Sequence, residues 1–335
     1  MRSLGLVVLA ACSFKAGAAG DAGSIDGPRA LDAAHDTGGG GGDGSAKPTC
    51  LDLWRAGTLG SGNFGAPREL TQLERGGNIV ERDPSVTLDG SAIFFSSNRL
   101  TNDLDIFVAT LAPGSDAFDG SSIAPIGTID DAADQQKITF AGSDLDIAVF
   151  ASSVEGDSQN FELAFAIRSN TSNLTSFNEA NVAPFQVSGH VIDDENVQND
   201  PWISPDGKRV YYADSSSGEQ KLLVATDDGT GNFPGGASAP VANINNDGGD
   251  NHADATLSQD ELVIVVSEVR NGATTLYYAS RADVGSAFGT PQVVPMSYPS
   301  NHTGDGHLTA DGCELYFSSD RSGGNDHIFV VDVTP

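Results

Sequence analysis

The feature that most constrains the fold is an internal repeat that runs through most of the chain. A phenylalanine that follows a polar loop recurs five times, at intervals of 54 to 59 residues: Phe64, Phe118, Phe177, Phe233 and Phe288. A period of this length is typical of chains that repeat one supersecondary unit. The sequence therefore predicts five copies of a single structural unit.

Each copy contains four segments with the character of short strands. After the phenylalanine comes a brief extended segment, and then, at 83–90, 200–207 and 305–312, a strand that begins with Asp and ends in an Asp-Gly turn. The segment 254–261 repeats it with Glu261 in place of Gly, and the second copy is degenerate, with Ala141-Gly142 at this place. Two apolar strands follow, for example 93–97 and 106–109 in the first copy. Asp-Gly supplies the positive φ that a tight hairpin needs. Four antiparallel strands per repeat predict a propeller blade and an all-β fold.

The two ends of the repeat region complement one another. The last copy stops after its third strand, at Val333, whereas an extra strand near 67–73 precedes the first complete copy. If the extra strand pairs with the last blade, the ring closes and no free sheet edge remains. We expect a five-bladed β-propeller of four-stranded antiparallel blades, closed by an N-terminal strand that completes the last blade.

The first fifty residues have the character of a targeting signal followed by a flexible linker. A basic start at Arg2 and an apolar run, Leu4 to Ala11, lead to Cys12. This pattern resembles the lipobox of bacterial lipoproteins, which implies cleavage before Cys12 and acylation of Cys12. An ordinary signal peptide is the alternative. We expect a signal peptide over 1–11, a lipidated cysteine and Gly/Ala/Asp-rich tether over 12–49, and the propeller over 50–335.

The residue after the cysteine, Ser13, resembles the pattern of lipoproteins sorted to the outer membrane. We therefore expect a domain outside the cytoplasm, anchored by lipid at the outer membrane or cell surface. The formal net charge of -29 disfavours nucleic acids and acidic ligands as partners. We expect a monomeric chain. Its expected partner is an envelope protein or a glycan.

The repeats also resemble a known family. The segments 204–212, Ser-Pro-Asp-Gly followed by an aromatic strand, and 315–321, which ends in Ser-Ser-Asp-Arg, are similar to the WD40-like repeat of TolB-type propellers. The resemblance covers about residues 80 to 333. It implies a propeller that acts as a binding or scaffolding module in the cell envelope, with its ligand at the loops around the channel mouth, and not an enzyme.

One column of aspartates recurs at the start of the Asp-led strand. Its members are Asp83, Asp200, Asp254 and Asp305, with Asp134 or Gln135 expected in the second blade. The first strand of a blade lines the central channel, so these carboxylates would gather at one mouth. They would form a Ca²⁺ or ligand site there. Alternatively, each Asp accepts hydrogen bonds from the backbone, a role that recurrence in every repeat favours.

An enzymatic alternative starts from the same column. The segment 83–90 is similar to the one that carries the catalytic base in five-bladed arabinanase-like glycoside hydrolases. Hydrolysis also needs a second, protonated carboxyl group. The sequence contains no Glu-Gly-Pro segment of the kind that those families carry. A glycoside hydrolase or a carbohydrate-binding propeller that uses the channel-mouth carboxylates is the second hypothesis.

Two cysteines, Cys50 and Cys313, belong to the propeller. Cys50 precedes the extra strand, and Cys313 begins the second strand of the last blade. In an oxidising compartment a disulfide between them would fasten the ring closure. Two unpaired thiols are the alternative, and the distance between the residues decides.

The lipid anchor has a direct test. Replacement of Cys12→Ala removes the acylated side chain, so we expect the variant to leave the membrane fraction while the wild-type chain stays in it. Fractionation followed by immunoblotting measures this. A variant that remains bound to membranes would contradict the lipoprotein hypothesis.

Overall fold

The computed structural model describes the chain from residue 47 to the C-terminus, with internal gaps. Residues 102, 128, 130–133, 143–144, 155–156, 171, 178–182, 185–186, 189–196, 216–218, 230–232, 235–237, 246–250, 271 and 297–301 lie outside the description. Cys12, the proposed signal peptide and most of the proposed tether also lie outside it. The compact unit that carries the fold spans Pro48–Pro335.

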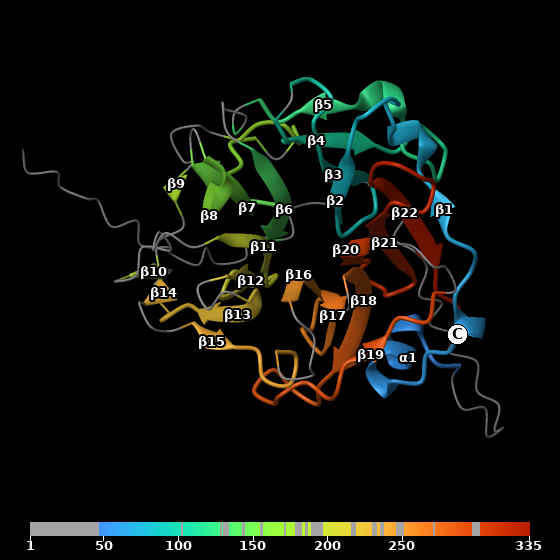
Figure 1. Cartoon of the computed structure of the whole chain (residues 1–335), viewed down its shortest axis with the longest axis vertical. Helices are drawn as coiled ribbons and strands as arrows, with labels where there is room; N and C mark the ends of the chain where they lie inside the picture. Colours follow the sequence, from blue (N-terminus) through green and yellow to red (C-terminus); the bar gives the residue numbers. More distant parts are fainter. Residues whose placement is uncertain are drawn as a thin grey trace, which may run out of the picture. The chain divides into compact units, whose positions relative to one another are not determined.

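Five four-stranded antiparallel sheets surround a central channel, which confirms the predicted five-bladed β-propeller (Figure 1). Blade 1 consists of β2 (Glu81–Val86), β3 (Ala92–Ser97), β4 (Asp105–Thr110) and β5 (Ala124–Pro125). Blade 2 consists of β6 (Gln135–Ala141), β7 (Ile147–Val154), β8 (Asp157–Ile167) and β9 (Ala183–Pro184). Blade 3 consists of β11 (Gln198–Ile203), β12 (Arg209–Asp214), β13 (Lys221–Thr226) and β15 (Ala239–Pro240).

Blade 4 consists of β16 (Asn251–Leu257), β17 (Val263–Arg270), β18 (Ala273–Ser280) and β19 (Gln292–Val293). Blade 5 consists of β20 (Thr303–Leu308), β21 (Glu314–Ser319), β22 (His327–Asp332) and β1 (Arg68–Glu69). Two further strands, β10 (Val187–Ser188) and β14 (Phe233–Pro234), pair in parallel outside the blades.

The ring closes as the sequence predicted. Strand β1 pairs antiparallel with β22, in the register Arg68↔Val330 and Glu69↔Phe329. An isolated bridge between Phe64 and Val333 extends the contact. The last blade is therefore built from three C-terminal strands and one N-terminal strand, and both chain segments are needed to complete it.

The hydrophobic core consists of separate layers between neighbouring blades. Phe94 of blade 1, for example, packs in one cluster with Ile138 and Phe150 of blade 2. Corresponding clusters join blades 2 and 3, 3 and 4, 4 and 5, and 5 and 1. Each blade therefore buries both faces only when the ring is complete.

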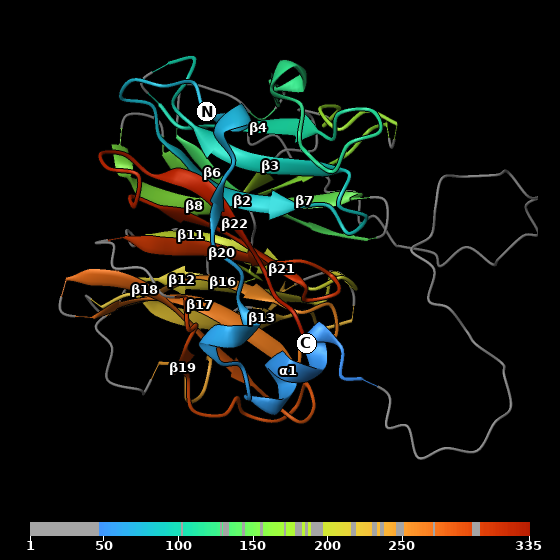
Figure 2. The ribbon, with the colours of Figure 1, turned by 90° about the vertical axis from the view of Figure 1, so that its right-hand side faces the viewer.

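A short helix that the repeat pattern did not predict precedes β1. Helix α1 (Cys50–Ala56) begins at a capping box formed by Thr49 and Asp52 and ends at Gly57, whose φ is 62°. The fully buried Trp54 donates from Nε1 to the carbonyl of Gly312 at 2.9 Å. Figures 1 and 2 show α1 beside the C-terminus of the chain. The helix therefore packs the N-terminal segment against the closing blade.

Three 3₁₀ turns complete the description: η1 (Ser61–Asn63), η2 (Thr71–Leu73) and η3 (Gly120–Ser122). Within the described residues, no helix has both the length and the apolar character needed to cross a membrane.

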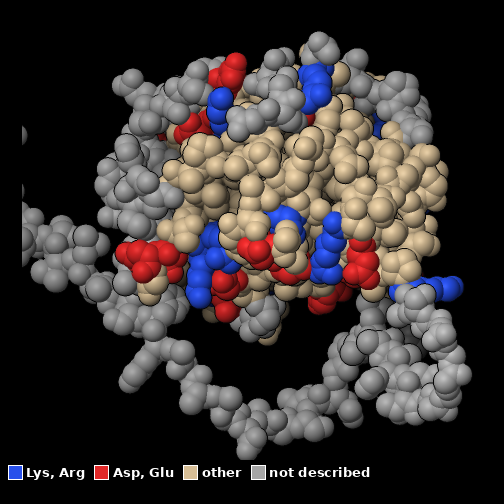
Figure 3. Space-filling view, turned by 90° about the horizontal axis from the view of Figure 1, so that it is seen from below, with Lys and Arg blue, Asp and Glu red and all other residues tan. Residues whose placement is uncertain are grey.

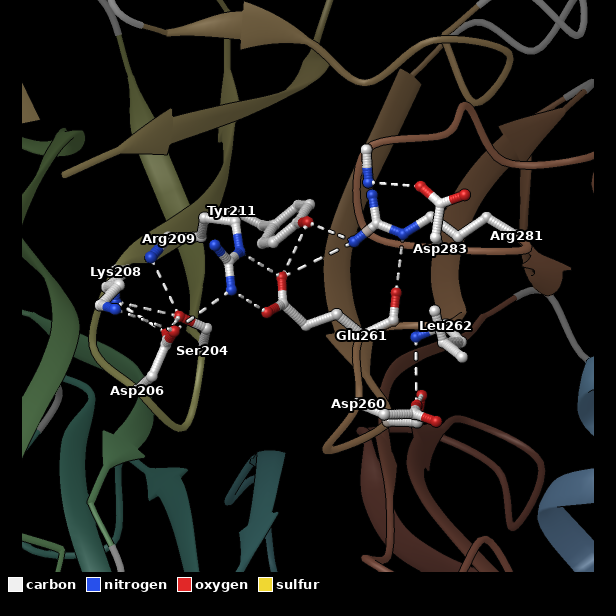
Figure 4. Close-up of polar contacts among 12 residues, drawn as sticks. Ser204, Asp206, Lys208, Arg209, Tyr211, Asp260, Glu261, Leu262, Arg281 and Asp283 are labelled. Atoms are coloured by element: carbon white, nitrogen blue, oxygen red, sulfur yellow. Dashed lines mark hydrogen bonds and ion pairs between the residues drawn. The ribbon is translucent and has the colours of Figure 1, made fainter. Parts of the chain in front are cut away.

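The hairpin turns at the ends of the innermost strands contain one exception to glycine. Gly90, Gly207 and Gly312 adopt positive φ, and Glu261 takes the equivalent position in blade 4 with φ 58°. Its carboxylate accepts hydrogen bonds from Arg209 Nε at 2.7 Å and from the Tyr211 hydroxyl at 3.2 Å (Figure 4). These contacts join blades 3 and 4 and offset the cost of the left-handed backbone, which is on the order of 1 kcal/mol.

Charged side chains of both signs lie close together on part of the surface. Figure 3 shows acidic and basic residues interleaved along one rim of the face in view, beside a broad area where the described residues are uncharged. The net acidity of the chain is therefore not a single continuous patch on that face.

The structure joins Cys50 and Cys313 in a disulfide, with the two Cα atoms 5.2 Å apart. The bond links α1 to the start of β21, residues separated by 263 positions. It therefore fastens the N-terminal segment to the blade that this segment completes.

Closing so long a loop restricts the unfolded chain, so removal of the disulfide destabilises the fold by about 3 kcal/mol. We expect the double variant Cys50→Ala/Cys313→Ala to unfold at a lower denaturant concentration than the wild type. A reductant should lower the wild-type midpoint to that of the variant and leave the variant unchanged. Equal midpoints for oxidised wild type and variant would contradict the closure role.

Candidate functional site

The innermost strand of every blade contains a bulge at the same place. In blade 1, Arg82 pairs with Ser96 and Ser85 pairs with Phe94, so two residues of β2 oppose one residue of β3. The same irregularity occurs in β6, β11, β16 and β20. A bulge bends its strand and re-aims the side chains next to it. Here it changes the course of all five strands around the channel.

The first residue of each bulge has a left-handed backbone. The φ angles are 56° for Asp83, 53° for Asp200, 50° for Asp254 and 53° for Asp305. Asp tolerates this conformation better than most residues with a side chain. The predicted aspartate column therefore coincides with a backbone position that the repeat itself imposes.

The expectation for the second blade was wrong. Lys137, with φ 48°, takes the equivalent bulge position in β6, and neither Asp134 nor Gln135 does. Each of the four aspartates lies seven residues before the positive-φ residue of its turn, but Lys137 lies only five residues before Gly142. In blade 2 the segment between the bulge and the turn is two residues shorter, so counting seven residues back from Gly142 leads to Gln135 instead of Lys137.

The structure brings the four aspartates together at one mouth of the channel. They line a pocket of about 220 Å³. Polar side chains from several blades complete it: Arg82, Gln136, Asn199, Gln220, Asn251 and His302. Each of the four aspartates is at most 7% exposed. The site is therefore a polar, nearly buried chamber.

Three of the carboxylates are close enough to share one ligand. One oxygen each from Asp83, Asp254 and Asp305 lies within 4.8 Å of the other two. Asp83 Oδ2 is buried and has no hydrogen-bond partner among the described residues, although Arg82 Nε lies 3.6 Å from it. A buried carboxylate oxygen without a hydrogen-bond partner indicates a position where a ligand can bind.

Mutual repulsion changes the protonation of the ring. Burial, together with the charge of Asp305, raises the pKa of Asp83 to about 7, although Arg82 and Lys137 oppose the shift. Burial and the charges of Asp200 and Asp305 raise the pKa of Asp254 well above its ordinary value. Burial also raises the pKa of Asp200, and the side chain of Asp254 acts against that shift.

Asp305 is the carboxylate that stays charged. Burial would raise its pKa, but the charges of His302, Arg82 and Lys137 outweigh burial and hold the pKa below the usual value. The Ser318 hydroxyl donates to Asp305 Oδ2, and this bond acts in the same direction. The ring therefore contains both a fixed negative charge and protons that a cation could displace.

In two blades, the backbone amide of the bulge residue donates a hydrogen bond to a serine hydroxyl of the preceding blade. Ser96 Oγ accepts from the Lys137 amide at 3.2 Å, and Ser267 Oγ accepts from the Asp305 amide at 3.0 Å. The amides of these left-handed residues are thus bonded without the use of an aspartate. The carboxylates remain available to face the channel.

Sequence analysis missed the basic members of the site, Arg82, Lys137 and His302. Arg82 directly precedes the first aspartate, and an alignment of the strands on their bulges instead of their turns would have found Lys137. Nothing in the sequence marks His302 as a member, because it lies before the bulge and reaches the pocket only through the fold.

His302 gives the site a pH dependence. Burial alone would lower the pKa of His302, but the hydrogen bond to Asp326, 2.8 Å from Nδ1, and the charges of Asp305 and Asp326 raise it to about 9. The folded state then binds the proton more tightly than the unfolded state. Its contribution to stability is complete below about pH 6.5 and is lost as the pH rises through 9.

We expect the free energy of unfolding of the wild type to exceed that of His302→Gln at pH 6, and the difference to shrink by pH 9. Denaturant titrations at several pH values measure it. Asp326→Asn removes the hydrogen-bond partner of His302, so it should reduce the pH dependence of the free energy of unfolding between pH 6 and 9. A difference that is constant between pH 6 and 9 would show that His302 does not carry the charge described.

The sequence matches no family model, and no curated protein matches it. Among solved structures, the catalytic domain of the GH62 α-L-arabinofuranosidase of Coprinopsis cinerea is 13% identical with a TM-score of 0.56, over 82% of this chain and 98% of that chain. Zg3597, a family 117 glycoside hydrolase from Zobellia galactanivorans, is 14% identical with a TM-score of 0.52, over 81% and 91%.

TolB from Acinetobacter baumannii is 16% identical with a TM-score of 0.45, over 76% of this chain and 55% of that one. The chain thus spans little more than half the length of that TolB. At these identities the likenesses to the two hydrolases show the fold alone.

Proposed function

We propose that this chain is a lipid-anchored binding module of the cell envelope, whose channel mouth binds a hard divalent cation of the Ca²⁺ class. One observation carries the cation assignment: three buried carboxylates, Asp83, Asp254 and Asp305, converge at the pocket, and Asp83 Oδ2 has no hydrogen-bond partner within the described part of the chain. The TolB-like repeats and the Cys12 lipobox support the envelope address.

The geometry of the ring suits such an ion. Calcium binds oxygen at 2.3–2.6 Å, so two oxygens on opposite sides of one ion are separated by about 4.8 Å, and neighbouring ones by less. The three carboxylate oxygens lie within 4.8 Å of one another. The amide oxygens of Asn199 and Asn251, which also line the pocket, each accept a hydrogen bond from Gln220 at 2.7 Å, so the carboxylates are the ligands that the proposal uses.

The charge of the ring points in the same direction. The pKa of Asp254 is raised well above its ordinary value and that of Asp83 to about 7, so both carboxyl groups hold a proton more strongly than a free aspartate does, and Arg82, Lys137 and His302 do not fully balance the ring. A divalent cation that displaced these protons would supply the missing positive charge at the place where the carboxylates repel one another.

Glycoside hydrolysis is the second candidate, favoured by the raised pKa of Asp254, as a general acid needs, beside Asp305, whose pKa is lowered. The geometry is less suitable for it. Three carboxylates have one oxygen each within 4.8 Å of the others, whereas glycoside hydrolases place two carboxyl groups about 5 Å or more apart on either side of the sugar. Release of arabinose from an aryl α-L-arabinofuranoside, lost in Asp254→Asn, would favour the enzyme over the binding module.

The cation site is tested by thermal melting of the chelated chain with and without millimolar Ca²⁺. A ligand of the native state must stabilise it, so we expect an upward shift of several degrees at a concentration far above Kd. Asp83→Asn and Asp254→Asn should abolish the shift. Asn also tolerates the left-handed backbone, so these variants should melt no lower than the wild type without Ca²⁺.

Asp116→Asn is the matched control, because it makes the same substitution at an exposed aspartate outside the pocket lining and should keep the Ca²⁺ shift. No shift in the wild type, or an equal shift in Asp83→Asn, would disprove the proposed cation site.

A further inference from the structure

A second group of acidic residues lies where the ring closes, and it includes a histidine. Glu69 belongs to β1, Glu74 follows η2, Glu81 begins β2 and His327 begins β22. His327 Nδ1 lies 3.8 Å from Glu69 Oε1, 3.6 Å from Glu74 Oε1 and 3.9 Å from Glu81 Oε2. One ligand atom each of Glu69, Glu74 and His327 lies within 4.8 Å of the other two, and Glu81 lies beside this group, with Oε2 3.9 Å from His327 Nδ1.

These distances do not describe hydrogen bonds. All three exceed the range for N–H···O bonds, and the nitrogen is nearly equidistant from the three oxygens. His327 Nδ1, Glu74 Oε1 and Glu81 Oε2 are buried atoms without a hydrogen-bond partner among the described residues. The side chain of Glu81 is only 1% exposed. Arg99 pairs with the other oxygen of Glu81, so Oε2 is the part of this buried carboxylate that a second cation would stabilise.

The other oxygens of the group are fixed from outside. Arg99 Nη2 donates to Glu81 Oε1 at 3.1 Å, and the Ser322 hydroxyl donates to Glu69 Oε2 at 2.5 Å. Each of these carboxylates is therefore anchored through one oxygen and presents the other to the centre. Such anchoring of the ligands by neighbouring groups is a usual feature of metal sites.

The propeller repeat does not require the buried glutamate. By strand register, the positions equivalent to Glu81 in the other blades carry no carboxylate: Gln135, Gln198, His252 and Thr303. The closure itself is already made by main-chain pairing between β1 and β22 and by the disulfide. An acidic side chain at this one position needs a separate explanation.

We propose that Glu69, Glu74 and His327, joined by Glu81 after a small shift of its side chain, form a second metal site, specific for a divalent transition metal of the Zn²⁺ class. Bonds of 2.0–2.2 Å in a tetrahedron separate the ligand atoms by about 3.4 Å, and the three distances to Nδ1 need only a small contraction to reach this value. The imidazole distinguishes the site from the channel mouth, whose ligands are oxygen atoms that suit Ca²⁺.

The bound ion would also neutralise the group. Three carboxylates and the guanidinium of Arg99 leave two negative charges, which one divalent cation balances. Because the four ligands come from β1, β2, β22 and the loop after η2, the metal would join the N-terminal strand, the first blade and the last blade. The metal would therefore strengthen ring closure at the junction between blade 5, which contains β1, and blade 1.

Calorimetric titration of the chelated full chain with Zn²⁺ tests the proposal. We expect the wild type to bind Zn²⁺, and Glu74→Gln and His327→Gln each to bind it at least tenfold more weakly. Glu74 is partly exposed and its amide replacement removes a repelling charge, so that variant should fold normally, as circular dichroism and melting in chelator can verify. Asp83→Asn should keep the Zn²⁺ affinity of the wild type.

The two cation sites fail independently in this design. Loss of the Ca²⁺ effect in Asp83→Asn with Zn²⁺ binding retained bears only on the channel mouth. Absence of Zn²⁺ binding in the wild type, equal affinity in Glu74→Gln and His327→Gln, or loss of Zn²⁺ binding only in Asp83→Asn would each overturn the proposed second site.

Discussion

The left-handed residue in the innermost strand of each blade is the constraint on which the rest of the structure depends. It forms the bulge that bends five strands around one channel, and it determines which side chain enters that channel. A glycine would adopt this backbone at lower cost, yet four blades use Asp and one uses Lys137. The fold therefore concentrates charge where it is most expensive to bury, and the raised pKa of Asp83 and Asp254 is the consequence.

Ring closure is the second constraint, since every hydrophobic cluster lies between two blades. An open ring would expose two such layers. The chain closes the ring three times over, with the β1–β22 pairing, the Trp54 anchor and the Cys50–Cys313 disulfide. The group around His327 lies at the same junction, on the blade 1 side. Blades and closure together explain why residues from the two ends of the chain meet at functional positions.

The sequence predicted the parts of the molecule that repeat. Apolar strands in five copies, with an Asp-Gly turn in three of them, were sufficient for blade number, strand order and closure. Helix α1 was missed because seven residues are too few to show a helical period, although the capping box at Thr49 and Asp52 was a local signal. Lys137 was missed because one shortened turn shifted the alignment of blade 2. Glu81 and His327 are 246 positions apart, and only the closed ring brings them together.

The most direct test of the central claim is a crystal structure of the chelated protein soaked in Ca²⁺. The account predicts an electron-density peak at the channel mouth, bonded to one oxygen each of Asp83, Asp254 and Asp305 at 2.3–2.6 Å. A channel mouth without such a peak at a saturating Ca²⁺ concentration would contradict it.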